Sequence, residues 1–208
     1  MNVSLFEALA RPGSSVVFYG TSLTASGGWV ETLATEIAKL YPGIKATNAA
    51  CDGQHSRWGL AEFDARVLSR SPDVLFVEFA INDAVARFAI SPEEARRNLE
   101  AMLDRLAAQR PHCVVVLQVM NPVLDRPPGH DGHRPELPAY EQAYREVAKA
   151  RRLLLVDHAP AWAALLAGGE SAFRHYVPDG LHPSPAGYAR FMLPTLRAAL
   201  GLPAASFL

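Results

Sequence analysis

The chain has 208 residues, half of them hydrophobic and a fifth charged, with a formal net charge of −1. This is ordinary globular composition and the length suits one core, so we expect residues 1–208 to form a single domain. The balanced charge does not favour nucleic acid or an anionic membrane as a partner. The sequence also lacks an apolar run of membrane-spanning length and the basic and apolar regions of a secretory signal. We therefore expect a cytoplasmic protein.

The two cysteines, Cys51 and Cys113, do not form the spaced framework of a disulfide-rich protein. We expect both to be reduced thiols, which agrees with a cytoplasmic location. Cys113 opens an apolar run, where a buried thiol is the usual outcome.

Short apolar runs alternate along the chain with longer segments of helical periodicity. Several runs are apolar almost throughout, as is typical of parallel strands that are covered on both faces. We predict strands at Ser15–Tyr19, Lys45–Ala49, Val74–Phe79, Cys113–Val119 and Leu153–Val156. We predict helices at Trp29–Tyr41, Arg57–Ser69, Pro92–Arg110 and Ala139–Arg151, and a last helix after Ser184. This alternation favours an α/β fold with a parallel sheet and helices on both of its faces.

The third predicted helix has the clearest start signal. Ser91 is the expected N-cap, Pro92 occupies the first helical position, and Glu94 completes a capping-box pattern. The stretch Asn121–Pro138, rich in proline and glycine, is the one long irregular segment. A loop of this length in a compact domain is often functional, although a mobile surface excursion is an equal alternative.

Polar residues follow the predicted strands at the positions where parallel sheets bind ligands. Ser22 follows the first strand in a Gly-Thr-Ser-Leu turn, Gly53 lies beyond the second, and Asn82 follows the third. Asp179 and His182 precede the last helix. These residue types suit acyl transfer, because a serine hydroxyl becomes a nucleophile when an adjacent base removes its proton.

The roles follow from that chemistry. Ser22 is the candidate nucleophile, His182 its base, and Asp179 the carboxylate that orients the imidazole. The oxyanion of the intermediate needs hydrogen-bond donors. The backbone N–H groups of Ser22 and Gly53 and the side-chain amide of Asn82 are the candidates for this oxyanion hole. The mechanism needs neither a metal nor another cofactor, and we expect none.

Taken together, the four motifs resemble the SGNH/GDSL hydrolase family, over nearly the whole chain. Gly20–Leu23 matches the nucleophile block, Gly53 and Asn82 match the next two blocks, and Asp179–His182 matches the last. Thr21 stands where the family usually has aspartate and Ala80 where it has glycine. The resemblance implies a three-layer α/β/α sandwich whose five-stranded parallel sheet has flavodoxin-like order.

Other sites and functions are weaker candidates. Asp157 and His158 form a second acid–histidine pair, but adjacent residues of an extended chain point to opposite faces, and Asp157 is better placed to cap the segment after it. His130 and His133 lack the further ligands of a zinc site. A nucleotide-binding module is disfavoured because the loop after the first strand contains no lysine.

The expected partner is a small-molecule ester, and the sequence leaves the oligomeric state open. We expect a short acyl group, most simply acetyl, on a polar alcohol such as a sugar. The polar residues of Asn121–Pro138 favour hydroxyl groups, and the sequence shows no amphipathic lid for a lipid. A lysophospholipase or thioesterase of the same family, and a non-catalytic binding relative, are the alternatives.

Overall fold

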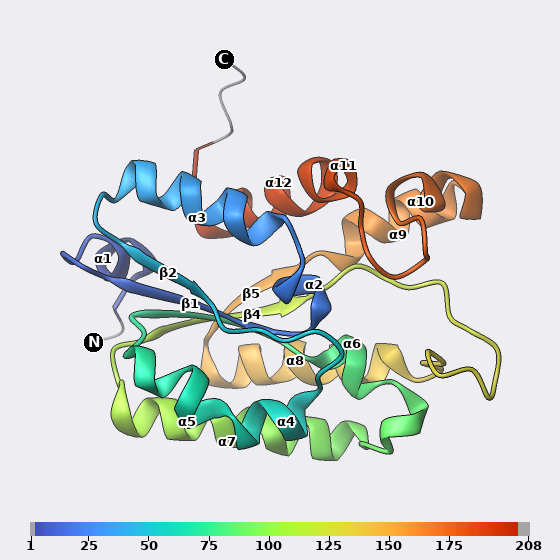
Figure 1. The fold of residues 1–208 in the computed structure, drawn as a ribbon, viewed down its shortest axis with the longest axis horizontal. Helices are drawn as coiled ribbons and strands as arrows, with labels where there is room; N and C mark the ends of the chain where they lie inside the picture. The colour runs from blue at the N-terminus through green and yellow to red at the C-terminus, as the bar shows by residue number, and fades with distance from the viewer. Residues whose placement is uncertain (1–2, 204–208) are drawn as a thin grey trace.

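The computed structural model of the chain describes residues 3–203. Five parallel strands form one sheet in the order β2-β1-β3-β4-β5. They are β1 (Ser15–Gly20), β2 (Lys45–Asn48), β3 (Val74–Glu78), β4 (Val114–Val119) and β5 (Leu154–Asp157). Each strand begins and ends within one residue of its predicted position. The predicted three-layer α/β/α sandwich with flavodoxin-like strand order is confirmed (Figure 1).

Helices cover both faces of the sheet (Figure 1). One layer contains α3 (Trp29–Leu40) and α12 (Leu193–Leu200), and the other contains α4 (Ser56–Ala61), α5 (Phe63–Arg66), α7 (Pro92–Gln109) and α8 (Leu137–Arg151). The shorter helices are α1 (Leu5–Leu9), α2 (Ser22–Ala25), α6 (Ala80–Asp83), α9 (Ala159–Ala167), α10 (Glu170–Tyr176) and α11 (Pro185–Gly187). There are also 3₁₀ turns at Leu68–Arg70 and Ala86–Phe88 and a π-helical turn at Tyr188–Met192. None of the helices in residues 3–203 combines the length and apolar character that crossing a bilayer requires.

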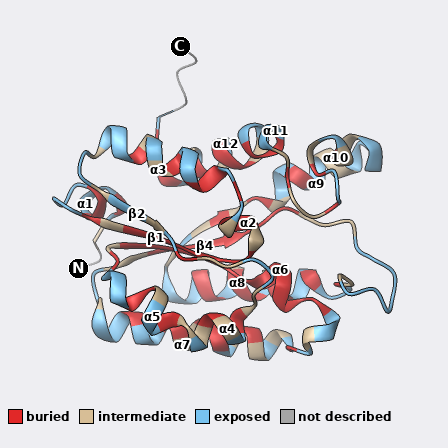
Figure 2. Ribbon diagram, viewed as in Figure 1, coloured by how far each residue is buried: buried red, intermediate tan, exposed pale blue. Residues whose placement is uncertain are grey.

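The core lies where the two helical layers meet the central strands (Figure 2). Every residue of β3 is buried, which explains why its sequence is apolar apart from one glutamate. Phe18 of β1 stacks on Phe76 of β3 with ring centroids 4.8 Å apart, and Trp29 of α3 packs edge-on against Phe18. These contacts hold the two central strands rigidly, so the turns that follow them start from fixed positions.

Two local predictions were wrong in detail. The single helix predicted at Arg57–Ser69 is divided into α4, α5 and a 3₁₀ turn, and the break brings Phe63 into the core beneath Tyr19. Ser91 does cap α7, since its Oγ accepts from the Glu94 N–H at 3.2 Å. The Glu94 carboxylate, however, binds Arg57 instead of returning to the cap.

Candidate active site

The turns after three adjacent strands meet at the carboxyl edge of the sheet. Because β1 lies between β2 and β3, the segments that carry Ser22, Gly53 and Asn82 are neighbours in space. These three residues and His182 line one cavity of about 590 Å³. The structure thus brings together residues that are up to 160 positions apart in the chain.

Ser22, His182 and Asp179 form a continuous hydrogen-bonded relay. The Ser22 Oγ lies 2.9 Å from the His182 Nε2, and the His182 Nδ1 lies 2.6 Å from the Asp179 Oδ2. The other carboxylate oxygen of Asp179 accepts from the backbone N–H groups of His182 at 2.7 Å and Leu181 at 2.9 Å. Both carboxylate oxygens are therefore engaged by the same turn, which fixes the imidazole relative to Ser22.

The charge state of Asp179 follows from these contacts. Burial alone would raise the pKa of Asp179, but the hydrogen bonds from the His182 side chain and from the two backbone N–H groups outweigh it and lower that pKa. The carboxylate is accordingly ionised at neutral pH. A negative charge beside Nδ1 keeps the proton on that nitrogen and leaves Nε2 free to accept the Ser22 proton.

Three residues at the cavity provide hydrogen-bond donors. Ser22 is the first residue of α2, so its backbone N–H has no partner within the helix. Gly53 has a φ of +70°, a conformation that favours glycine, and its N–H also makes no backbone hydrogen bond within residues 3–203. The Asn82 side-chain amide donates one N–H to the Gln54 carbonyl at 2.9 Å and keeps a second. These N–H groups can donate hydrogen bonds to a developing oxyanion.

The turn that carries Ser22 is held by Glu78, which the sequence analysis did not identify. Its buried carboxylate accepts from the Thr21 N–H at 2.6 Å and hydroxyl at 3.0 Å, and from the Thr24 hydroxyl at 2.7 Å. Burial raises the pKa of Glu78 to about 7, against the lowering effect of those three donors. A lone glutamate in a buried apolar strand was the available sequence signal. Thr21, at the family's aspartate position, supplies a hydroxyl donor that an ionised aspartate lacks.

The second departure from the family pattern is also accommodated. Ala80 begins α6, and within residues 3–203 the non-glycine residues with positive φ are Ser71, Ala89 and Arg152. Ala80 therefore has a backbone conformation that tolerates a β-carbon. The block after β3 is tied to the block after β2 by Asp83, whose Oδ1 accepts from the Ser56 N–H at 2.7 Å.

The long irregular segment forms one wall of the cavity. Asp131, Gly132 and Arg134 line it, together with Asp52 and Arg87 from other loops. The sequence analysis included Asp131 and Arg134 only among the polar residues of Asn121–Pro138 and gave neither a role in the site. Asp131 pairs with Arg87, and Arg134 bonds the Ile81 carbonyl and Asn82, contacts between distant parts of the chain that local patterns do not reveal.

Asp157 and His158, the second acid–histidine pair, each bind other residues. Asp157 binds Arg145, with 2.8 Å between its Oδ2 and the Arg145 Nε, and its Oδ1 accepts from the Ala159 N–H, as expected of a cap. His158 is fully buried, and its Nε2 lies 3.3 Å from the Gln118 Oε1. Burial lowers the pKa of His158 to about 4, so the ring is neutral at physiological pH.

His130 and His133 contact their own loop. The His130 Nδ1 accepts from the Gly132 N–H at 2.9 Å, and the His133 Nδ1 lies 2.6 Å from the Arg126 carbonyl. No group of three or more potential metal ligands occurs among residues 3–203.

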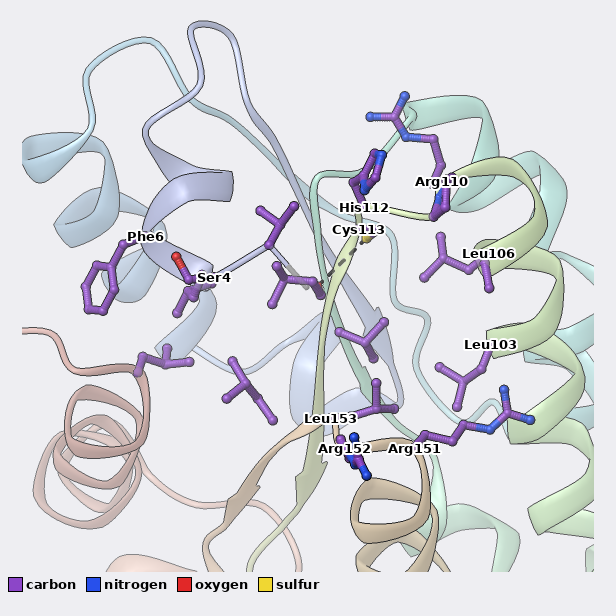
Figure 3. Close-up of a pocket in the computed structure, with 18 of the residues that line it drawn as sticks. Ser4, Phe6, Leu103, Leu106, Arg110, His112, Cys113, Arg151, Arg152 and Leu153 are labelled. Atoms are coloured by element: carbon purple, nitrogen blue, oxygen red, sulfur yellow. Dashed lines mark hydrogen bonds between the residues drawn. The ribbon is translucent and has the colours of Figure 1, made fainter. Parts of the chain in front are cut away.

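A larger cavity of about 810 Å³ lies at the opposite, amino-terminal edge of the sheet (Figure 3). Its walls combine apolar side chains of α1, α7 and the ends of β4 and α12 with Arg110, Arg151 and Arg152, and His112 and Cys113 lie at one end. Burial raises the pKa of the Cys113 thiol to about 12, so it is not a nucleophile at neutral pH. The residues suited to acyl transfer are therefore at the smaller cavity.

Comparison with known structures agrees with the fold. A protein described as a GDSL-like lipase from Parabacteroides merdae is 20% identical with a TM-score of 0.80, over 93% of this chain and 98% of its own. Axe2, an acetylxylan esterase from Geobacillus stearothermophilus, is 18% identical with a TM-score of 0.78, over 96% and 100%. LAE5, an α/β hydrolase from the metagenome of Lake Arreo in Spain, is 23% identical with a TM-score of 0.77, over 95% and 100%.

A search of curated proteins found no match. A family model does match, and it spans residues 13–190, which include every block of the cavity described above. That model is the GDSL-like lipase/acylhydrolase family, and the chain belongs to this family.

Proposed function

We propose that the protein is a serine ester hydrolase that cleaves short-chain acyl esters of a polar alcohol through an acyl-enzyme on Ser22. The observation that carries the proposal is the relay at the cavity. The 2.9 Å contact from the Ser22 Oγ to the His182 Nε2, and the 2.6 Å contact from the His182 Nδ1 to Asp179, are within the range for nucleophile activation.

The first half of the reaction forms the acyl-enzyme. His182 takes the Ser22 proton on Nε2 while Oγ bonds to the ester carbonyl carbon, and Asp179 stabilises the imidazolium. The carbonyl oxygen becomes an oxyanion that accepts from the backbone N–H groups of Ser22 and Gly53 and from the Asn82 amide. The carbon–oxygen bond to the alcohol then breaks, and His182 delivers its proton to the departing alcohol.

The second half releases the acid. Water attacks the acyl carbon while His182 Nε2 accepts its proton, and the same donors bind the second oxyanion. The bond to the Ser22 Oγ breaks, Oγ recovers the proton from His182, and the carboxylic acid leaves. The cycle returns the relay to its starting state without a cofactor.

The lining of the cavity supports a polar alcohol. Asp52, Arg87 and Asp131 line the cavity around Ser22, and charged groups of this kind bind hydroxyls by directed hydrogen bonds. The apolar lining is confined to Val85, Phe88 and Leu181, which suits a small acyl group better than a long chain. Axe2, one of the similar structures, is an acetylxylan esterase by name, which is consistent with an acetylated sugar as substrate here.

The dependence of kcat/KM on acyl length distinguishes the proposed function from its alternatives. Aryl esters from acetate to octanoate should be cleaved with falling kcat/KM, and acetylated sugars should release acetate. A site for long chains would gain about 0.8 kcal/mol per buried methylene, so kcat/KM would rise steeply toward octanoate. Such a rise would replace the proposal with a lysophospholipase or thioesterase, and a complete lack of hydrolysis would favour a non-catalytic binding relative.

A further inference from the structure

The segment between β4 and α8, residues 121–136, spans both halves of the candidate active site. Near its start, the Leu124 N–H donates to the Gly180 carbonyl at 2.9 Å, and the Arg126 Nη2 donates to the Asp179 carbonyl at 2.9 Å. Near its end, Arg134 reaches α6 on the other side of the cavity. The segment therefore connects the turn of the acid and base to the turn of Asn82.

Arg134 makes three hydrogen bonds with one guanidinium group. Its Nε donates to the Ile81 carbonyl at 2.7 Å, Nη1 donates to the Gly132 carbonyl at 2.7 Å, and Nη2 donates to the Asn82 Oδ1 at 3.3 Å. The residue is 9% exposed, although it comes from a loop that is otherwise largely at the surface. Its own N–H is held by the Asp125 Oδ1 at 2.6 Å, which fixes the backbone from which the side chain extends.

These contacts determine which way the Asn82 amide points. A side-chain amide has a donor end and an acceptor end of nearly the same shape, so its orientation depends on its partners. The acceptor end of Asn82 binds Arg134, and the donor end gives one N–H to the Gln54 carbonyl. If the amide turned over, Oδ1 would face the Gln54 carbonyl and present lone pairs where the oxyanion develops.

We propose that Arg134 is a positioning residue that holds the Asn82 amide with its free N–H directed at the oxyanion of the reaction. The inference rests on the proposed esterase function and adds a residue outside the family's four blocks. Arginine suits this task because its planar, five-donor group binds three acceptors at once. A lysine ammonium is a single point charge and cannot span the Ile81 carbonyl and Asn82 in the same geometry.

A double-mutant cycle between Asn82 and Arg134 tests the inference on an aryl acetate. Arg134→Met in the otherwise unchanged protein should lower kcat about 10- to 100-fold, the range for losing a hydrogen bond to a charged group, with little change in KM. In the Asn82→Ala background the same substitution should lower kcat by less than about threefold, because the amide it positions is gone.

The matched control is Arg126→Met, the same substitution in the same segment. Arg126 contacts the Asp179 carbonyl and makes no hydrogen bond with Asn82, so its effect should be equal in the two backgrounds. If Arg134→Met does not fold, the cycle is repeated with Arg134→Lys, which keeps the charge. Arg134→Lys should show the same coupling to Asn82→Ala. Thermal unfolding of each variant shows that the chain is folded before its kinetics are compared.

The outcomes separate the inference from the proposed function. An equal loss of kcat from Arg134→Met in both backgrounds, or a loss confined to KM, would overturn the positioning role while leaving the esterase intact. An unchanged protein that hydrolyses no ester would overturn the proposed function, and the inference with it.

Discussion

Gly20 and Glu78 are register partners across β1 and β3, and a β-carbon on Gly20 would lie 2.2 Å from the Glu78 Oε1. The glycine at this position therefore makes room for the carboxylate that binds the Thr21 N–H and hydroxyl. The backbone conformation does not require a glycine here, because Gly20 does not have a positive φ. Gly20 thus leaves the space in which Glu78 binds Thr21.

Gly20→Ala should lower the free energy of unfolding by about 1–3 kcal/mol, the usual cost of overpacking a core. Its kcat should fall as well, because displacing Glu78 disturbs the turn that presents Ser22. Urea unfolding and aryl acetate hydrolysis measure the two effects. Gly28→Ala is the control, since a β-carbon there meets no atom within 4 Å, and it should change neither quantity. Equal behaviour of the two variants would show that the contact with Glu78 is unimportant.

Thr21→Asp introduces the residue that the family usually has at this position. The new carboxylate would face Glu78, whose oxygens lie 3.0 and 3.1 Å from the Thr21 hydroxyl. A buried charge without a partner costs about 3–5 kcal/mol, so the variant should be strongly destabilised at pH 8. The loss should be smaller at pH 5, where the two carboxyl groups can share a proton.

Two companion variants isolate the charge effect at position 21. Thr21→Val removes the hydroxyl without adding charge and should cost about 1–3 kcal/mol, less at pH 5 than at pH 8, because the hydroxyl favours the ionised form of Glu78. Glu78→Gln combined with Thr21→Asp should recover stability, because the glutamine amide can donate to the new carboxylate. If Thr21→Asp is as stable as the unchanged protein at pH 8, the like-charge interpretation is wrong.

The strands and the four site blocks were predictable because each depends on neighbouring residues. An apolar run such as Val74–Phe79, interrupted only by Glu78, identifies a covered parallel strand, and the carboxyl edge of the sheet then brings together Ser22, Gly53 and Asn82. The π-helical turn after α11 and the break at Phe63 were not predictable in the same way. Both depend on packing against distant elements, which outweighs the local helical pattern.

The supporting contacts were missed for a related reason. Glu78 and Thr21 are 57 positions apart, and Arg134 and Asn82 are 52 apart. Sequence alone gives the residue types at each position but not the pairing of a charged side chain with a particular acceptor across the fold. Glu94 illustrates the point, because its spacing suggested a capping box and its carboxylate binds Arg57 instead.

The buried ring of His158 predicts a pH-dependent term in stability. Its folded pKa, lowered by burial to about 4, lies below the ordinary value of 6.5, so the unfolded chain binds the proton first as pH falls. Stability that is present above pH 6.5 is therefore lost as pH falls toward 4, by up to about 3 kcal/mol.

A comparison with His158→Leu isolates this term. The free energy of unfolding of the unchanged protein, minus that of the variant, should rise between pH 4 and 6.5 and level off above it. Glu78 and Asp83, whose pKa values burial raises to about 7, titrate in both proteins and cancel in the difference. The variant should keep its esterase activity, because His158 does not line the cavity of Ser22. Parallel stability curves would contradict the assignment of a neutral buried ring.

The role of Ser22 is tested most directly by reaction with an aryl fluorophosphonate, followed by mass spectrometry of the peptides. One label per chain should be found, on Ser22, and it should appear in step with the loss of aryl acetate hydrolysis. Ser22→Ala should take up no label and lose essentially all activity while unfolding at the same temperature as the unchanged protein. Labelling of a different residue, or substantial hydrolysis by a folded Ser22→Ala protein, would contradict nucleophilic catalysis by Ser22.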